Sequence, residues 1–212
     1  MSFTRDPGDY LTGVSRQTAV DNLMRYFDSF TGRRFDDFAH RSSPNHFTAW
    51  DVVAVSTLSV QIPSNAAIRL IDDEIADAEG ELGVLLSRIP EDAAVWDKVD
   101  YLAGDVARQL WSLIRGLPEL GRTKTSKLLA AKRPFLFPIY DRYVGNALLA
   151  NQETDDWPLW RERFAGVSGQ ELIRSCDSVR REAGLPDGIS ALRILDVSIW
   201  MMETSPTTTL PV

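Results

Sequence analysis

Apolar residues recur at intervals of three and four along most of this chain, which is the spacing of one face of an α-helix. The segment from Val20 to Phe27 shows this pattern, and so does the segment from Leu192 to Met202. The alternation of apolar and polar residues that marks a strand is not sustained anywhere in the sequence. The pattern predicts an all-α protein, a multi-helix single unit of about eight to ten helices.

Capping residues predict where several helices begin, because their side chains accept hydrogen bonds from the free amides of the first turn. Thr18 precedes the first helix, and Thr48 precedes a strongly apolar helix from Ala49 to about Val60 with Asp51 in its first turn. The other predicted boundaries are a helix from about Ala94 to Arg115 ended by Gly116, the N-cap Asp141 of a helix from Arg142 to Ala150, a Ser168–Glu171 capping box for a helix ending near Ala183, and the N-cap Ser190 of the last helix.

The predicted helices form one domain with short ends. Residues 1–17 are expected to be a flexible lead-in, residues 18–203 a single all-α domain, and residues 204–212 a disordered tail. The composition agrees with a globular domain, since 44% of the residues are hydrophobic and 25% are charged.

The residue types exclude several classes of protein. With one cysteine, Cys176, and two histidines, neither a disulfide within the chain nor a zinc site of the usual kind is expected. No apolar run approaches the roughly 20 residues of a membrane span, and the first residues lack the apolar core of a signal peptide. We therefore expect a soluble cytoplasmic protein with no metal, no cofactor and no membrane partner.

The charges are unevenly distributed along the chain. The net charge is −7, yet the stretch from Arg115 to Arg142 contains seven Lys/Arg and two Asp/Glu. A cluster of cations in an acidic protein is typical of a local anion site. We call five of these cations the basic island: Arg122, Lys124, Lys127, Lys132 and Arg133.

The basic island lies on a predicted helix-hairpin-helix at about residues 105–131. The first amides of its second helix lack partners within the helix, and together with the helix dipole they suit a phosphate. Lys124 and Lys127 share one face of that helix, while Leu128 and Leu129 point toward the core. An ordinary hairpin with its lysines in water remains the alternative. The predicted phosphate-binding residues are Gly121, Arg122, Thr123, Lys124, Lys127, Lys132 and Arg133.

The segment Leu117-Pro118-x-Leu120-Gly121-Arg122, followed by Asp141-x-x-Val144, resembles the helix-hairpin-helix DNA glycosylase superfamily. In that superfamily a Leu-Pro-Gly-Val-Gly hairpin clamps DNA, and an Asp-x-x-Val segment supplies the catalytic aspartate. In bifunctional members a lysine on the helix after the hairpin attacks the sugar. The resemblance implies a DNA-glycosylase-like core in which Asp141 is the candidate catalytic residue.

The sequence departs from that superfamily at two positions. Glu119 stands where the hairpin has its first glycine, and its carboxylate would repel phosphate. The position of the lysine falls on Thr123, with Lys124 one residue later, and one residue turns a side chain by about 100° on a helix. Asp141 also has a structural role as an N-cap. These departures predict the absence of robust catalysis.

A second resemblance covers nearly the whole chain. Its motifs include Thr31-Gly32-Arg33-Arg34-Phe35, Lys132-Arg133-Pro134 and Leu195-Asp196-Val197-Ser198-Ile199-Trp200. They resemble a family of unknown function found in actinobacteria. This resemblance implies a single evolutionary unit and supplies no activity.

The sequence thus leads to one function hypothesis and two alternatives. The leading hypothesis is binding of DNA or another phosphate-bearing ligand through a degenerate helix-hairpin-helix without robust catalysis. The first alternative is a protein- or small-ligand-binding domain in which the hairpin is purely structural. The second alternative is a base-excision enzyme that uses Asp141.

Overall fold

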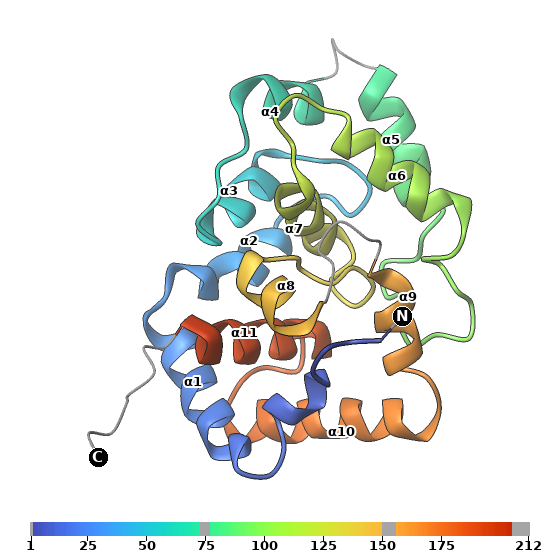
Figure 1. The fold of residues 1–212 in the computed structure, drawn as a ribbon. Helices are drawn as coiled ribbons and strands as arrows, with labels where there is room; N and C mark the ends of the chain where they lie inside the picture. Colours follow the sequence, from blue (N-terminus) through green and yellow to red (C-terminus); the bar gives the residue numbers. More distant parts are fainter. Residues whose placement is uncertain (1, 73–76, 150–155, 205–212) are drawn as a thin grey trace.

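The computed structural model describes residues 2–72, 77–149 and 156–204 of the chain. Within these ranges every regular element is helical, which confirms the all-α prediction (Figure 1). No helix there is both long and apolar enough to cross a bilayer. The elements are η1 (Pro7–Tyr10), α1 (Ser15–Ser29), η2 (Thr31–Arg34), α2 (Phe35–Ala39), α3 (Ala49–Thr57), α4 (Ser64–Ile71), α5 (Asp77–Ser87), α6 (Asp105–Arg115), α7 (Arg122–Lys132), α8 (Arg142–Leu148), α9 (Trp157–Arg163), α10 (Gly166–Glu182) and α11 (Ala191–Thr204), where η marks a 3₁₀ helix.

Two helices form the centre of the fold. α11 packs against η1, α1, α8 and α10, while α7 packs against α2, α3 and α6. In Figure 1, α7 and α8 lie between a group formed by α3 to α6 and a group formed by α1, α10 and α11. Residues 125–132 of α7 and residues 191–199 of α11 are all buried. The polar side chains within these two stretches therefore face other parts of the protein rather than water.

Three of the predicted caps are confirmed. The Thr48 and Asp51 side chains form a capping box at the start of α3. Asp141 accepts a 2.9 Å hydrogen bond from the amide of Tyr143 at the start of α8. Ser190 Oγ accepts one from the amide of Arg193 at the start of α11. Each cap depends only on residues within three positions, so sequence patterns reveal it.

Two other predicted starts are wrong. Thr18 lies inside α1, which begins at Ser15, and Ser168 lies inside α10, which begins at Gly166. The N-cap residues, Val14 and Ala165, make no side-chain capping hydrogen bond. Contacts between helices therefore extend both helices beyond the residues that local signals favour.

The predicted long helix before the hairpin is shorter than expected. α6 begins at Asp105, and the preceding residues form turns. Asp97 Oδ2 accepts a hydrogen bond from the amide of Ala94, and Asp100 Oδ1 accepts one from the amide of Ala103. These local bonds offer the backbone an alternative to a helix, which explains the difference.

Part of the segment before α1 packs against the domain. η1 contacts α11, and both Tyr10 and Leu11 are buried. The Tyr10 hydroxyl donates a hydrogen bond to Glu203 at the other end of the chain. Thr204 belongs to α11, and the remainder of the predicted tail, residues 205–212, lies outside the described residues.

Candidate functional site

The turn between α6 and α7 is compact. Leu117 and Leu120 are buried in it, and Arg115 Nη1 donates a 2.9 Å hydrogen bond to the carbonyl of Leu120. Glu119 has φ +59°, in the left-handed region that favours glycine. Glu119 therefore takes a glycine-like backbone conformation while its carboxylate is exposed. The turn fixes where α7 begins, and α7 carries four of the five cations of the basic island.

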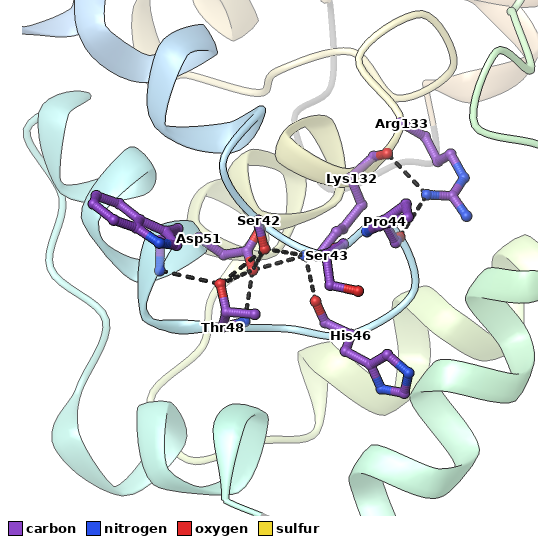
Figure 2. Close-up of polar contacts among 9 residues, drawn as sticks. Ser42, Ser43, Pro44, His46, Thr48, Asp51, Lys132 and Arg133 are labelled. Carbon is purple, nitrogen blue, oxygen red and sulfur yellow. Dashed lines mark hydrogen bonds and ion pairs between the residues drawn. The ribbon is translucent and has the colours of Figure 1, made fainter.

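Lys132, at the end of α7, lies inside the protein (Figure 2). Its Nζ donates hydrogen bonds of 2.6–2.7 Å to the side chains of Ser42 and Asp51 and to the carbonyls of Ser43 and His46. The side chain of Asp51 is 0% exposed and that of Lys132 is 1% exposed. Lys132 therefore attaches the loop between α2 and α3 to α7 and has no surface from which to hold a phosphate.

Arg133 is also fully engaged within the protein. Its guanidinium donates to the carbonyl of Leu86 in the last turn of α5 and to that of Ile89 just after it, and also to the carbonyl of Pro44 and to Asn45 Oδ1. The residue is 0% exposed. The prediction placed Lys132 and Arg133 in a surface cluster. The structure instead uses both cations to satisfy backbone carbonyls of the loop, because a buried carbonyl needs a donor.

The first turn of α7 remains closer to the surface. Arg122 forms a 2.7 Å ion pair with Asp156 and lies over the ring of Tyr140, while Lys124 Nζ donates to the carbonyl of Glu119. Gly121 and Thr123 are partly exposed beside them. Residues 121–124 are thus the part of the predicted phosphate site that solvent can reach.

Lys127 faces a different direction from the one that the sequence predicts. Its side chain is 3% exposed, and its Nζ lies 3.7 Å from Asp141 Oδ2. The same Nζ donates a 3.0 Å hydrogen bond to the carbonyl of Leu58 at the end of α3. Burial lowers the pKa of Lys127, and the carboxylates of Asp141 and Asp196 offset part of that effect. The structure thus brings the buried Lys127 and the partly exposed Asp141 together.

Lys127 and Asp141 line a pocket of about 340 Å³, which we call the α7–α8 pocket. Its walls come from α1, η2, α3, α7, α8 and α11. Aromatic and aliphatic side chains make up much of the lining: Tyr26, Phe30, Leu58, Val60, Ile139, Tyr143, Val197 and Trp200. Small-molecule sites typically combine such apolar walls with a few converging polar groups.

Arg193 organises the polar end of this pocket. Its guanidinium is paired with Asp36 and Asp196, and it donates 2.9 Å hydrogen bonds to the Tyr26 hydroxyl and the Gly32 carbonyl. Burial raises the pKa values of Asp36 and Asp196, although Arg193 favours their charged forms. Arg193 therefore joins α1, η2, α2 and α11 around one wall of the pocket.

Sequence reasoning missed the part of the site that comes from α1 and α11. Arg193 and Asp196 are two opposite charges three positions apart in the mostly apolar segment from Leu192 to Met202. This pair is the signal in the sequence that points to a polar site on the last helix. A charged pair within a buried helix needs partners, whereas Tyr26 and Trp200 have the same spacing as ordinary core residues.

The described residues offer no cluster of three or more His, Cys, Asp or Glu side chains able to hold a metal ion. Cys176 is buried in α10, and burial raises the pKa of its thiol. A raised pKa disfavours the reactive thiolate form of this cysteine.

The chain belongs to a family of unknown function (DUF6308), which matches residues 19–203. No curated protein and no solved structure matched the sequence. The family names no ligand or reaction, so the function has to be argued from the α7–α8 pocket itself.

Proposed function

We propose that the α7–α8 pocket binds a small carbonyl compound with a ring, which Lys127 captures as an imine with the help of Asp141. The observation that carries this proposal is the buried Lys127 ammonium 3.7 Å from the Asp141 carboxylate in the wall of a pocket. This proposal develops the small-ligand alternative, in which the hairpin is structural. The hairpin's role is to place α7 so that Lys127 faces inward.

The position of Lys127 favours reaction as a free amine. A lysine amine attacks a carbonyl only when it is deprotonated, and burial lowers the pKa of Lys127. Its hydrogen bond to the Leu58 carbonyl holds the nitrogen at the pocket wall. Lysines that are desolvated in this way are the ones that proteins use as bases and in Schiff bases.

Asp141 is placed to move the protons. Its Oδ1 accepts a hydrogen bond from the amide of Tyr143, and its Oδ2 faces Lys127. In the proposed reaction Asp141 takes a proton from the ammonium, and the amine nitrogen then bonds to the carbonyl carbon. Asp141 returns this proton to the former carbonyl oxygen, which becomes a hydroxyl, and then carries a second proton from the nitrogen to that hydroxyl. The hydroxyl leaves as water while the C=N bond forms. One ammonium and one carbonyl thus give one protonated imine and one water.

The pocket walls suit a planar ring. Phe30 and Trp200 are in edge contact with each other, and both line the pocket together with Tyr26. A volume of about 340 Å³ is at the small end of ligand sites. The lining therefore favours a single-ring or two-ring compound over a large cofactor.

Reductive trapping tests the proposal. Benzaldehyde with cyanoborohydride at neutral pH is expected to modify Lys127 ahead of other lysines, because its lowered pKa leaves more free amine. The modified residue is identified by peptide mass spectrometry. Lys127→Met should lose this product, whereas Lys124→Met, three residues earlier on the same helix, should retain it. Asp141→Asn keeps the N-cap and should slow trapping roughly 10²-fold. Equal labelling of Lys124 and Lys127 in the unmodified protein would refute the proposal.

A base-excision activity is the second candidate, because the pair of Lys127 and Asp141 favours it as well. Lys127 lies one helical turn after Thr123 on one face of α7, so it replaces the lysine that the glycosylase resemblance expects at Thr123. The partly exposed residues 121–124 offer a small phosphate contact on the same helix as Lys127. Release of a damaged base from duplex DNA that disappears in Asp141→Asn would favour this candidate. If the protein neither releases a base nor binds DNA at low salt, the base-excision candidate is excluded.

A further inference from the structure

Arg142 stands at the outer edge of the α7–α8 pocket. It lines the pocket next to Asp141, but unlike Lys127 and Arg193 it is exposed. Within the described residues, Arg142 forms no ion pair with a carboxylate. Arg142 contacts the neighbouring Tyr143: its guanidinium lies 5.2 Å from the centre of the ring, and its Nη2 lies 3.4 Å from the hydroxyl oxygen.

The charges of the pocket are balanced except at Arg142. The lining contains three cations and two carboxylates. Lys127 is matched by Asp141, and Arg193 is matched by Asp196. Asp36 also pairs with Arg193, from behind the pocket wall, and it is not part of the lining. The unmatched charge that a ligand in the pocket meets is therefore the guanidinium of Arg142.

Arg142 and Tyr143 together present hydrogen-bond donors at one place. A guanidinium offers five N–H groups in a fixed fork that matches carboxylate and phosphate oxygens. Tyr143 is 37% exposed beside it, and its phenol adds an O–H donor. An oxyanion at the outer edge can accept from both side chains while the rest of the ligand extends toward Lys127.

We propose that the ligand of the α7–α8 pocket carries an oxyanion, a carboxylate or a phosphate, that Arg142 and Tyr143 bind at the outer edge. This inference rests on the proposed function, because it takes the carbonyl end of the same ligand to be at Lys127. It defines the substrate class as a small acidic aldehyde or ketone. Arg142 is then the residue that selects charged ligands over neutral ones.

Unreactive probes separate this inference from imine formation. p-Toluate, p-tolyl phosphate and the neutral p-toluamide have the same ring and no aldehyde, so calorimetric titration measures recognition alone. We expect at least one anion to bind about fivefold or more tightly than p-toluamide. Arg142→Gln should remove this preference, and Tyr143→Phe should reduce it. The matched control is Arg88→Gln, which changes the net charge equally at an exposed residue outside the pocket lining.

The two anions distinguish the possible sources of the oxyanion. Tighter binding of p-toluate indicates a carboxylate ligand, and tighter binding of p-tolyl phosphate indicates a phosphate ligand. Equal binding of p-toluamide and both anions overturns the inference, and so does an Arg142→Gln protein with unchanged preference. Failure of both anions to bind in the millimolar range also overturns it.

Trapping with 4-formylbenzoate then tests the proposed function independently. If the anion preference is present but Lys127 is not modified, the imine proposal fails while the oxyanion site stands. If 4-formylbenzoate and benzaldehyde modify Lys127 equally well in the unmodified protein and in Arg142→Gln, the oxyanion site fails while imine formation stands.

Discussion

Replacing Lys132 by methionine is expected to lower the free energy of unfolding by about 3–5 kcal/mol. The variant leaves the Asp51 carboxylate, which is 0% exposed, without the cation that neutralises it. It also leaves the carbonyls of Ser43 and His46 without their ammonium donor. A buried charge without a partner costs far more than the lost ion pair was worth, because water cannot replace the partner.

Urea unfolding followed by circular dichroism measures this effect. Lys124→Met removes a lysine from the same helix, where its Nζ makes one exposed hydrogen bond, and should change stability by less than about 0.5 kcal/mol. The double variant Asp51→Leu with Lys132→Met removes both charges and should recover much of the loss, less about 1 kcal/mol for the capping box. If Lys132→Met is as stable as Lys124→Met, the buried ion pair does not exist as described.

Arg193→Met should destabilise the protein by a similar amount and should also change how its stability depends on pH. Arg193 is the cation shared by Asp36 and Asp196, and it donates to the Tyr26 hydroxyl. Burial already raises the pKa values of both carboxyls, and the loss of Arg193 removes the interaction that lowers them.

The sign of the pH effect follows from proton binding. Above the ordinary carboxyl pKa of about 4, the unfolded chain has released protons that the buried carboxyls of the folded variant still hold. Its free energy of unfolding should therefore fall as pH rises toward the raised pKa values of Asp36 and Asp196, and it should be larger at about pH 5 than at about pH 7.5. Adding Asp36→Asn and Asp196→Asn to Arg193→Met should abolish this difference. An Arg193→Met protein with the same pH profile as the unmodified chain would contradict the network.

The sequence predicted those features that depend on neighbouring residues. Thr48 with Asp51, and Asp141 with Tyr143, form their caps within three positions, so residue type and spacing were sufficient. The all-α class followed from the period of the apolar residues over many turns, which averages out errors at individual positions.

The direction of the lysines could not be predicted in this way. The argument that Lys124 and Lys127 share a helix face assumed that a lysine turns toward water, as most do. Lys127 instead meets the carbonyl of Leu58 and the carboxylate of Asp141, which come from other elements. A helical wheel contains no information about which segment lies opposite, so the pocket could be found only in three dimensions.

The contacts that hold the loop between α2 and α3 also determine when this protein can fold. Lys132 donates hydrogen bonds to Asp51 and Ser42, which lie 81 and 90 residues earlier in the chain. Arg133 donates one to Asn45, which lies 88 residues earlier. Contacts so distant along the chain close late, because the entropy of the intervening loop opposes them. During synthesis, the first helices emerge with Asp51 still lacking its cation and the loop carbonyls still lacking donors. Their packing is completed only after α7 has left the ribosome, so the N-terminal half of this protein cannot mature as an independent unit.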